Sequence, residues 1–277
     1  MASPATLSRR SLGLQLTLLA LGASTQGTTV GCKSYPATVK GTTLPPPSTT
    51  AGRPLNVVCV GGHPDDPEES CGGTLARYVE VGHRVTIVYL TRGEAGIAGK
   101  SHAEAAAIRT AEAEEACRIL GARPVFAGQI NGETELSRPR IEAMATILRA
   151  EAPDIVFTHW PLDTNLDHQI ASIVTIQALR TIESSAAVFF FETELGRQTQ
   201  AFHPTDYVDI TATREKKVAA LFAHRSQDPE RIYREHHRLM EDLRGREASS
   251  REVRVEAAEA FCRYRQRNAI GSGLPGL

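Results

Sequence analysis

VVCVGGHPDD, residues 57–66, is the stretch that decides the fold expected of this chain. It opens with four small apolar residues and continues with two glycines, the pattern of a short buried strand that ends at a turn. Similar apolar runs recur at 85–90, 125–127, 155–158 and 188–191. Helical patterns separate them at 74–81, 103–120, 141–149 and 170–179. This alternation is typical of parallel strands joined by right-handed crossovers, so we predict an α/β fold: a Rossmann-like, mostly parallel sheet with helices on both faces.

A single domain, residues 55–277, is expected to hold all of these elements. The chain has 277 residues, 41% of them hydrophobic, which is enough for one sizeable core. Its last third has an apolar run at Tyr207–Ile210 and helical patterns from Ala212, which predict a helical C-terminal extension over one end of the sheet. The net charge of −1 and the aromatic content of 5% argue against nucleic acid and anionic membranes as partners. Two functional classes then remain: an enzyme that acts on a small molecule, or a binding protein.

Residues 1–32 are typical of an export signal. The uncharged apolar run Leu12–Ala23 is shorter than a membrane span and follows Arg9-Arg10, which favours a twin-arginine signal; an ordinary secretory signal is the alternative. Cys32 ends a weak lipobox, so a lipid anchor at Cys32 is the one membrane attachment that the sequence indicates. Residues 33–54 have the Thr- and Pro-rich composition of a linker. We therefore expect export to the periplasm or cell envelope.

Two loops are expected to meet at one edge of the sheet, because the carboxyl ends of parallel strands share an edge and ligands bind beyond it. In the first loop, His63 and Asp66 are three residues apart in a turn and can face one point, while Asp65 points elsewhere. In the second, Asp167-His168 begins the helix after the fourth predicted strand. Two His and one Asp leave a coordination position open, the pattern of a catalytic zinc site. Turns in which the Asp residues only cap backbone amides are the alternative.

Beyond these loops, the sequence resembles the LmbE-like (PIG-L) family of deacetylases over about residues 57–227. The matching motifs are, in order, His63-Pro64-Asp65-Asp66, Cys71-Gly72-Gly73-Thr74-Leu75-Ala76, Gly82-His83-Arg84-Val85, Leu90-Thr91-Arg92-Gly93-Glu94, Arg109 with Glu112, Asp167-His168 and His224-Arg225-Ser226-Gln227. The resemblance implies a Rossmann-like sheet and hydrolysis of N-acyl groups, mostly N-acetyl groups on glucosamine units. It also implies a cofactor, Zn²⁺ or another divalent metal such as Fe²⁺.

Roles for single residues follow from the same resemblance. His63, Asp66 and His168 would be the metal ligands and Asp65 the general base. Apart from the resemblance, Asp167 at the start of its helix is expected to be a further catalytic residue, which caps the helix and orients a neighbouring group.

Substrate contacts are expected from Arg109, Asn131 and His159. Arg109 matches an arginine that contacts substrate in the family, and a guanidinium in a polar cleft suits sugar hydroxyls or a phosphate. Pairing with Glu104 or Glu112 on the surface of its own helix is the alternative. Asn131 stands where many members have Asp.

A departure from the family pattern concerns Asn165, which stands where members usually have His, three residues before the last ligand. We expect Asn165 to be a catalytic residue that donates a neutral hydrogen bond at the reacting carbonyl, in a slower enzyme than one with a titrating His. His224 either approaches the site or is a helix-end histidine stabilised by the helix dipole.

The sequence thus predicts a metal-dependent hydrolase that deacylates an N-acetyl or other N-acyl amino sugar through metal-activated water, with Asp65 as the base. A non-catalytic or weakly active sugar-binding protein of the same fold is the main alternative, and phosphoester hydrolysis is the third. The glycine pairs at 61–62 and 72–73 lack the spacing of a nucleotide-binding loop. Self-association into a homo-oligomer is left open.

Overall fold

The structure is a computed structural model that describes residues 53–194 and 197–264. The predicted export signal, Cys32 and nearly all of the predicted linker lie outside the described residues. Among the helices in the described ranges, none combines the length and the apolar character needed to cross a membrane.

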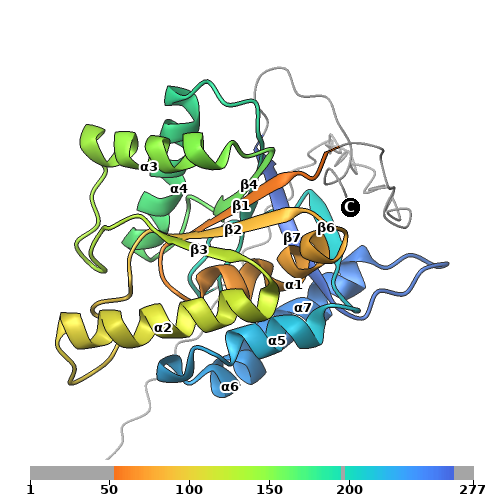
Figure 1. Cartoon of the computed structure of the whole chain (residues 1–277). Helices are drawn as coiled ribbons and strands as arrows, with labels where there is room; N and C mark the ends of the chain where they lie inside the picture. Colours follow the sequence, from red (N-terminus) through yellow and green to blue (C-terminus); the bar gives the residue numbers. More distant parts are fainter. Residues whose placement is uncertain (1–52, 195–196, 265–277) are drawn as a thin grey trace, which may run out of the picture. The chain divides into compact units, whose positions relative to one another are not determined.

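A seven-stranded sheet forms the centre of the domain, in the order β3-β2-β1-β4-β5-β7-β6 (Figure 1). The strands are β1 (Asn56–Gly61), β2 (Arg84–Tyr89), β3 (Arg123–Phe126), β4 (Ile155–His159), β5 (Ala187–Phe191), β6 (Asp206–Asp209) and β7 (Ala258–Tyr264). The first five are parallel to one another. The predicted mostly parallel sheet is therefore confirmed.

Helices cover both faces of this sheet because successive residues of a strand point to opposite sides. In β1, Val57 and Cys59 pack into the core under α1, α2 and α5, while Val58 and Val60 pack into the core under α3 and α4. Figure 1 shows these two helical layers on opposite sides of the sheet. Their helices are α1 (Asp66–Glu80), α2 (His102–Leu120), α3 (Arg138–Glu151), α4 (Leu166–Thr181) and α5 (Arg214–Leu221).

The C-terminal part differs from the predicted helical extension. Helices are present, as α5, α6 (Pro229–Ile232), the π-helical segment Tyr233–His237 and α7 (Arg238–Ala248). The chain then returns to the sheet as β7, which lies antiparallel between β5 and β6. This insertion covers the edge of β5, an apolar strand whose free backbone groups would otherwise face solvent. The short run AEAFCRY gives only a weak strand signal, since its buried Glu259 interrupts the apolar pattern.

Helix α1 begins eight residues earlier than the sequence indicated. Its first turn carries Asp66, Pro67, Glu68 and Glu69, and both the proline and the acidic side chains favour a helix N-terminus. The sequence pattern did not indicate the first half of α1, because that half contains Gly72 and Gly73 and glycine has low helix propensity.

The two glycines are required by close packing against the C-terminal part. A Cβ on Gly73 would lie 2.7 Å from Cβ of Ile210, and a Cβ on Gly72 would lie 2.9 Å from Cγ of Lys217. The Glu259 carboxylate accepts hydrogen bonds from the amides of Gly73 and Thr74, at 2.9 and 2.8 Å. Lys217 Nζ in turn lies 2.8 Å from Glu259. Buried charge therefore ties α1 to β7 and α5.

We expect Gly73→Ala to destabilise the fold. Alanine has better helix propensity than glycine by about 1 kcal/mol, but the added methyl group would overpack Ile210 at a cost of about 1–3 kcal/mol. Urea unfolding should show a lower midpoint with an unchanged slope. An equal or higher midpoint would mean that α1 and the Ile210 segment can move apart freely.

Candidate metal centre

The predicted metal ligands lie where β1 and β4 end. These strands are adjacent, and the helices that follow them lie on opposite faces, α1 on one and α4 on the other. That point of an open parallel sheet is its topological switch point, where the chain diverges and leaves room for a ligand. His63 follows β1, and His168 lies in the first turn of α4.

The turn after β1 requires glycine at positions 61 and 62, because neighbouring side chains leave no space for a larger residue there. A Cβ on Gly61 would lie 2.6 Å from the Pro67 ring, and one on Gly62 would lie 3.0 Å from the His168 ring. The turn ends at Asp65, which has a φ of 108° that non-glycine residues rarely adopt. Asp66 then starts α1, and its Oδ2 accepts a hydrogen bond of 2.7 Å from the His63 amide.

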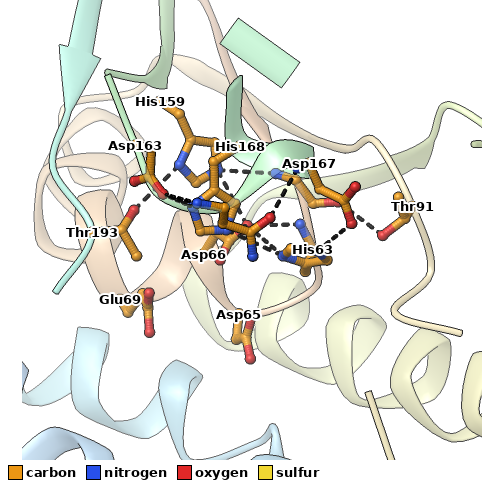
Figure 2. A network of polar contacts seen from close by, with 12 residues as sticks. His63, Asp65, Asp66, Glu69, Thr91, His159, Asp163, Asp167, His168 and Thr193 are labelled. Atoms are coloured by element: carbon orange, nitrogen blue, oxygen red, sulfur yellow. Dashed lines mark hydrogen bonds and ion pairs between the residues drawn. The ribbon is translucent and has the colours of Figure 1, made fainter. Parts of the chain in front are cut away.

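Three side-chain atoms from these loops face one another. Asp66 Oδ2 lies 3.2 Å from His63 Nδ1 and 3.3 Å from His168 Nε2, and the two nitrogens are 3.3 Å apart. Figure 2 shows the three side chains converging, while Asp65 turns away from them. All three residues are buried.

The hydrogen-bond partners of the two histidines determine which nitrogen carries a proton. His63 Nε2 lies 2.9 Å from Asp167 Oδ2, and His168 Nδ1 lies 3.3 Å from Asp163 Oδ1. An ionised carboxylate only accepts, so the hydrogen bond to Asp167 puts N–H on His63 Nε2. The ion-pair contact with Asp163 favours N–H on His168 Nδ1 in the same way. When the rings are neutral, the other nitrogens, His63 Nδ1 and His168 Nε2, point their lone pairs at Asp66 Oδ2. This carboxylate–histidine arrangement is the usual support of a metal ligand.

The three atoms fit a divalent metal ion. When both histidines are neutral in these tautomers, the three atoms are all acceptors and repel one another unless a cation lies among them. In a tetrahedral site with bonds of about 2.0–2.1 Å, neighbouring ligand atoms are about 3.3–3.4 Å apart, which matches the observed separations. Nitrogen and carboxylate oxygen are also donors that zinc and iron accept.

The electrostatics of the site likewise favour a cation. Burial opposes protonation of His63, but Asp66 and Asp167 outweigh it and raise its pKa to about 9. His168 behaves similarly: burial lowers its pKa, and Asp66 and Asp163 raise it to about 10. The carboxylates that hold protons on these rings would attract a metal ion in their place.

His159 lies behind the three atoms and is fully buried. Its Nε2 accepts a 3.0 Å hydrogen bond from the Gly62 amide, its Nδ1 lies 3.2 Å from Thr193 Oγ1, and its ring stacks on His168 at 4.0 Å. Burial and then the nearby His168 lower the pKa of His159 to about 4. His159 could form a second group with Asp163 and His168, but both of its nitrogens are already engaged. Its burial differs from the predicted substrate contact and fits a role in positioning His168.

Asp65 and Arg109 form an ion pair in which Arg109 is buried and Asp65 is half-buried. Arg109 Nη2 lies 2.8 Å from Asp65 Oδ2 and also donates to the Pro64 carbonyl. Burial raises the pKa of Asp65 to about 6, although Arg109 opposes the rise. Arg109 is only 3% exposed. The carboxylates of Glu104 and Glu112 bind Ser101 and Ser226 instead. The structure therefore places Arg109 on Asp65, where the sequence predicted a substrate contact or a surface pair.

Asn131 contributes to the support of Asp167. The Asp167 carboxylate accepts hydrogen bonds from Asn131 Nδ2 at 2.8 Å, from the Gly132 amide at 2.8 Å and from Thr134 Oγ1 at 2.6 Å. Burial alone would raise the pKa of Asp167, but His63 and these donors have the larger opposite effect. The pKa of Asp167 is therefore well below its usual value, and the carboxyl is ionised. Asn131 thus fixes His63 through Asp167, a different position from the predicted substrate contact.

Asn165 is the N-cap of α4. Its side-chain oxygen accepts a hydrogen bond of 2.9 Å from the Asp167 amide, the contact that stabilises a helix start. The sequence had offered Asp167 as the cap and Asn165 as a donor at the reacting carbonyl. The donor role stays a prediction, and it would fall to the amide nitrogen of the same side chain.

Asp163 and Thr134 are supporting residues that the sequence reasoning missed. The signal for Asp163 was present, since it lies five residues before His168 in the same loop. Thr134 belongs to the loop after β3, and only the folded chain brings it to Asp167.

Comparison with known proteins shows which family and which relatives this sequence resembles. Residues 58–179 match the profile of the PIG-L family, described as GlcNAc-PI de-N-acetylase. The chain is 30% identical over 200 residues to the diacetylchitobiose deacetylase of Thermococcus kodakarensis, covering 64% of this chain and 72% of that protein. It is also 26% identical over 185 residues to the 4-oxalmesaconate hydratase of Pseudomonas putida, covering 60% and 71% respectively.

Among solved structures, the fold resembles N,N′-diacetylchitobiose deacetylase from Pyrococcus horikoshii bound to an inhibitor. The TM-score is 0.66 at 26% identity, over 75% of this chain and 83% of the other.

Removing the Asp167 carboxylate should weaken metal binding without removing a ligand. Asp167→Ala frees the His63 ring to rotate or to take the wrong tautomer, so we expect about a 10–100-fold loss of affinity for Zn²⁺. Competition with a chromogenic chelator measures this loss. His168→Ala, which removes a ligand, should abolish tight binding. Wild-type affinity in Asp167→Ala would contradict the proposed support of His63.

Substitutions at Asn165 separate capping from catalysis. Asn165→Ala should lower the free energy of unfolding by about 0.5–2 kcal/mol, because the Asp167 amide loses its cap, while Asn165→Ser should restore most of it. Ser lacks the amide N–H, so comparing the stability and kcat of the two variants shows which function the side chain performs. If Asn165→Ser is stable but slow, the amide acts in the reaction.

Proposed function

This chain belongs to the PIG-L family of deacetylases, and on that premise we propose that it is a metal-dependent hydrolase that removes an acetyl or other acyl group from an amino sugar or its conjugate. The mutual approach of His63 Nδ1, Asp66 Oδ2 and His168 Nε2 carries this proposal. These residues would hold the divalent ion, with Zn²⁺ favoured and Fe²⁺ as another candidate. A divalent ion bound there would polarise the amide carbonyl and make water more acidic.

Asp65 is the proposed general base. Its side chain is 18% exposed and therefore within reach of water, in contrast to the more deeply buried ligands. Arg109 binds Oδ2, while Oδ1 accepts no hydrogen bond from the described part of the chain. Oδ1 can take the proton of the water that attacks the amide carbon. When the C–N bond breaks, the same carboxyl can return the proton to the leaving amine.

The residues around the ligands keep this geometry fixed. Asp167 orients His63 and Asp163 orients His168. His159 supports the His168 ring by stacking on it. Preorganisation of this kind lowers the reorganisation that the reaction requires.

Hydration of a double bond is the second candidate, because one relative is a hydratase. A base and a divalent ion would serve that reaction as well. The similarity to deacetylases at higher identity favours amide hydrolysis. An intact Asp65 beside the ligands favours catalysis over sugar binding alone.

We also propose that the protein acts outside the cytoplasm, in the periplasm or cell envelope, as the signal-like residues 1–32 indicate. Amino-sugar conjugates of the envelope would then be the natural substrates to test.

The decisive experiment is an assay of the metal-loaded protein with N-acetylglucosamine, its short oligomers and its conjugates, measuring released acetate and free amine. We expect Asp65→Asn to keep one bound metal ion per chain but to lower kcat by about 10²–10⁴-fold, the usual contribution of a general base. His63→Ala should lose both metal and activity. Metal-bound wild type without acetate release on any amide, or Asp65→Asn with full activity, would contradict the proposal.

A further inference from the structure

The segment His224-Arg225-Ser226-Gln227 follows α5 and has no role in the mechanism above. It forms a single 3₁₀ turn over Arg225–Gln227. His224 is fully buried and Arg225 is exposed, while Ser226 and Gln227 are half-buried. The three less exposed side chains contact three different segments, and each of these segments leads to Asp65 or Arg109.

The first contact is with α2. Ser226 donates two hydrogen bonds to the Glu112 carboxylate, from its amide to Oε1 at 2.8 Å and from Oγ to Oε2 at 2.7 Å. Glu112 lies three residues after Arg109, on the same face of the helix. The double hydrogen bond therefore fixes the turn of α2 from which Arg109 extends.

The second contact is with the turn at 93–96. Gln227 Nε2 donates to the Gly96 carbonyl at 3.2 Å and to Ser226 Oγ at 2.9 Å. This turn lies directly against the Arg109 guanidinium: a Cβ on Gly93 or Gly96 would lie 2.5 or 2.4 Å from Arg109 Nη1. Only glycine leaves space there for the guanidinium, so the position of the turn limits the position of the arginine.

The third contact is with α1. His224 Nε2 lies 3.5 Å from Glu68 Oε1, and both residues are fully buried. Glu68 lies in the first turn of α1 and accepts a hydrogen bond from the Tyr89 hydroxyl. The pair therefore holds the start of the helix whose N-cap is Asp65.

Asp65 needs such support, since its φ of 108° is unfavourable for a residue with a side chain. Arg109 binds both sides of the strained position, the Pro64 carbonyl before it and the Asp65 carboxylate itself. A shift of Arg109 would release both.

We infer, on the basis of the function proposed above, that His224, Ser226 and Gln227 form a positioning element: they hold Arg109 from α2 and from the 93–96 turn, and through Arg109 they hold Asp65 in place. Ser226 and Gln227 are positioning residues and do not contact substrate. Ser226 acts on Arg109 through Glu112, Gln227 acts on it through Gly96, and Arg109 acts on Asp65.

A double-mutant cycle on the metal-loaded full chain tests this coupling. Gln227→Ala and Ser226→Ala should each lower kcat about 10–100-fold with little change in KM, the scale of effect of a misplaced reactive group. Ser226→Thr, which keeps the hydroxyl, should recover most of the rate. In an Arg109→Lys background, Gln227→Ala should change kcat less than about twofold, because the group through which it acts is gone.

Arg225→Ala is the matched control, since the same turn carries this exposed side chain; we expect a change in kcat below about twofold. Metal content should be unchanged in the variants at 225, 226 and 227. Full additivity of Gln227→Ala and Arg109→Lys would overturn the inference, as would equal losses in Arg225→Ala and Gln227→Ala.

Hydrogen exchange provides a measurement that needs no substrate. In metal-loaded Gln227→Ala, amides in the segment 65–69 should exchange faster than in wild type, and in Arg225→Ala they should not. If wild type releases no acetate while this exchange pattern holds, the proposed function fails and the positioning element stands. Unchanged exchange in Gln227→Ala would overturn the positioning element whatever the activity.

Discussion

The arrangement of the site depends on three lone pairs held in contact. His63 Nδ1, Asp66 Oδ2 and His168 Nε2 approach within 3.2–3.3 Å, a geometry that is repulsive unless a metal ion or protons on the two histidines lie between them. The fold must therefore hold these atoms in place while a metal ion replaces the protons of the two histidines. It does so by placing them at the ends of two adjacent strands and by fixing each histidine with a carboxylate on its far side.

Buried charge holds the surrounding elements in the same way. Lys217 lies 2.9 Å from Glu241 and 2.8 Å from Glu259, and Glu259 also accepts hydrogen bonds from two amides of α1. Burying these charges is costly unless each is paired. Because the pairs join α1, α5, α7 and β7, they lock the C-terminal part onto the helix that begins at the site. The strain at Asp65 can persist because several such contacts determine its surroundings.

Relatives that deacetylate and one that hydrates show that this type of fold supports more than one reaction. Both reactions need water and a base, which the ligand group and Asp65 would supply. Discrimination between substrates must therefore come from residues around the ligands, and the structure assigns several of the nearest ones to support. Arg109, Asn131 and His159 bind Asp65, Asp167 and the His168 ring.

The sequence by itself determined the parallel core and the loops that carry the ligands, because β-branched runs and helical periodicity report which faces of each element are buried. It could not place β7, whose pairing with β5 depends on an edge formed about 70 residues earlier. Only the tertiary structure decided that Arg109 pairs with Asp65, that Glu112 binds Ser226 and that Asn165 caps α4. Most of these partners are far apart in the chain, and a buried polar group takes whichever partner packing brings within hydrogen-bond distance. Local periodicity determines which residues are buried, but it does not determine which of them meet.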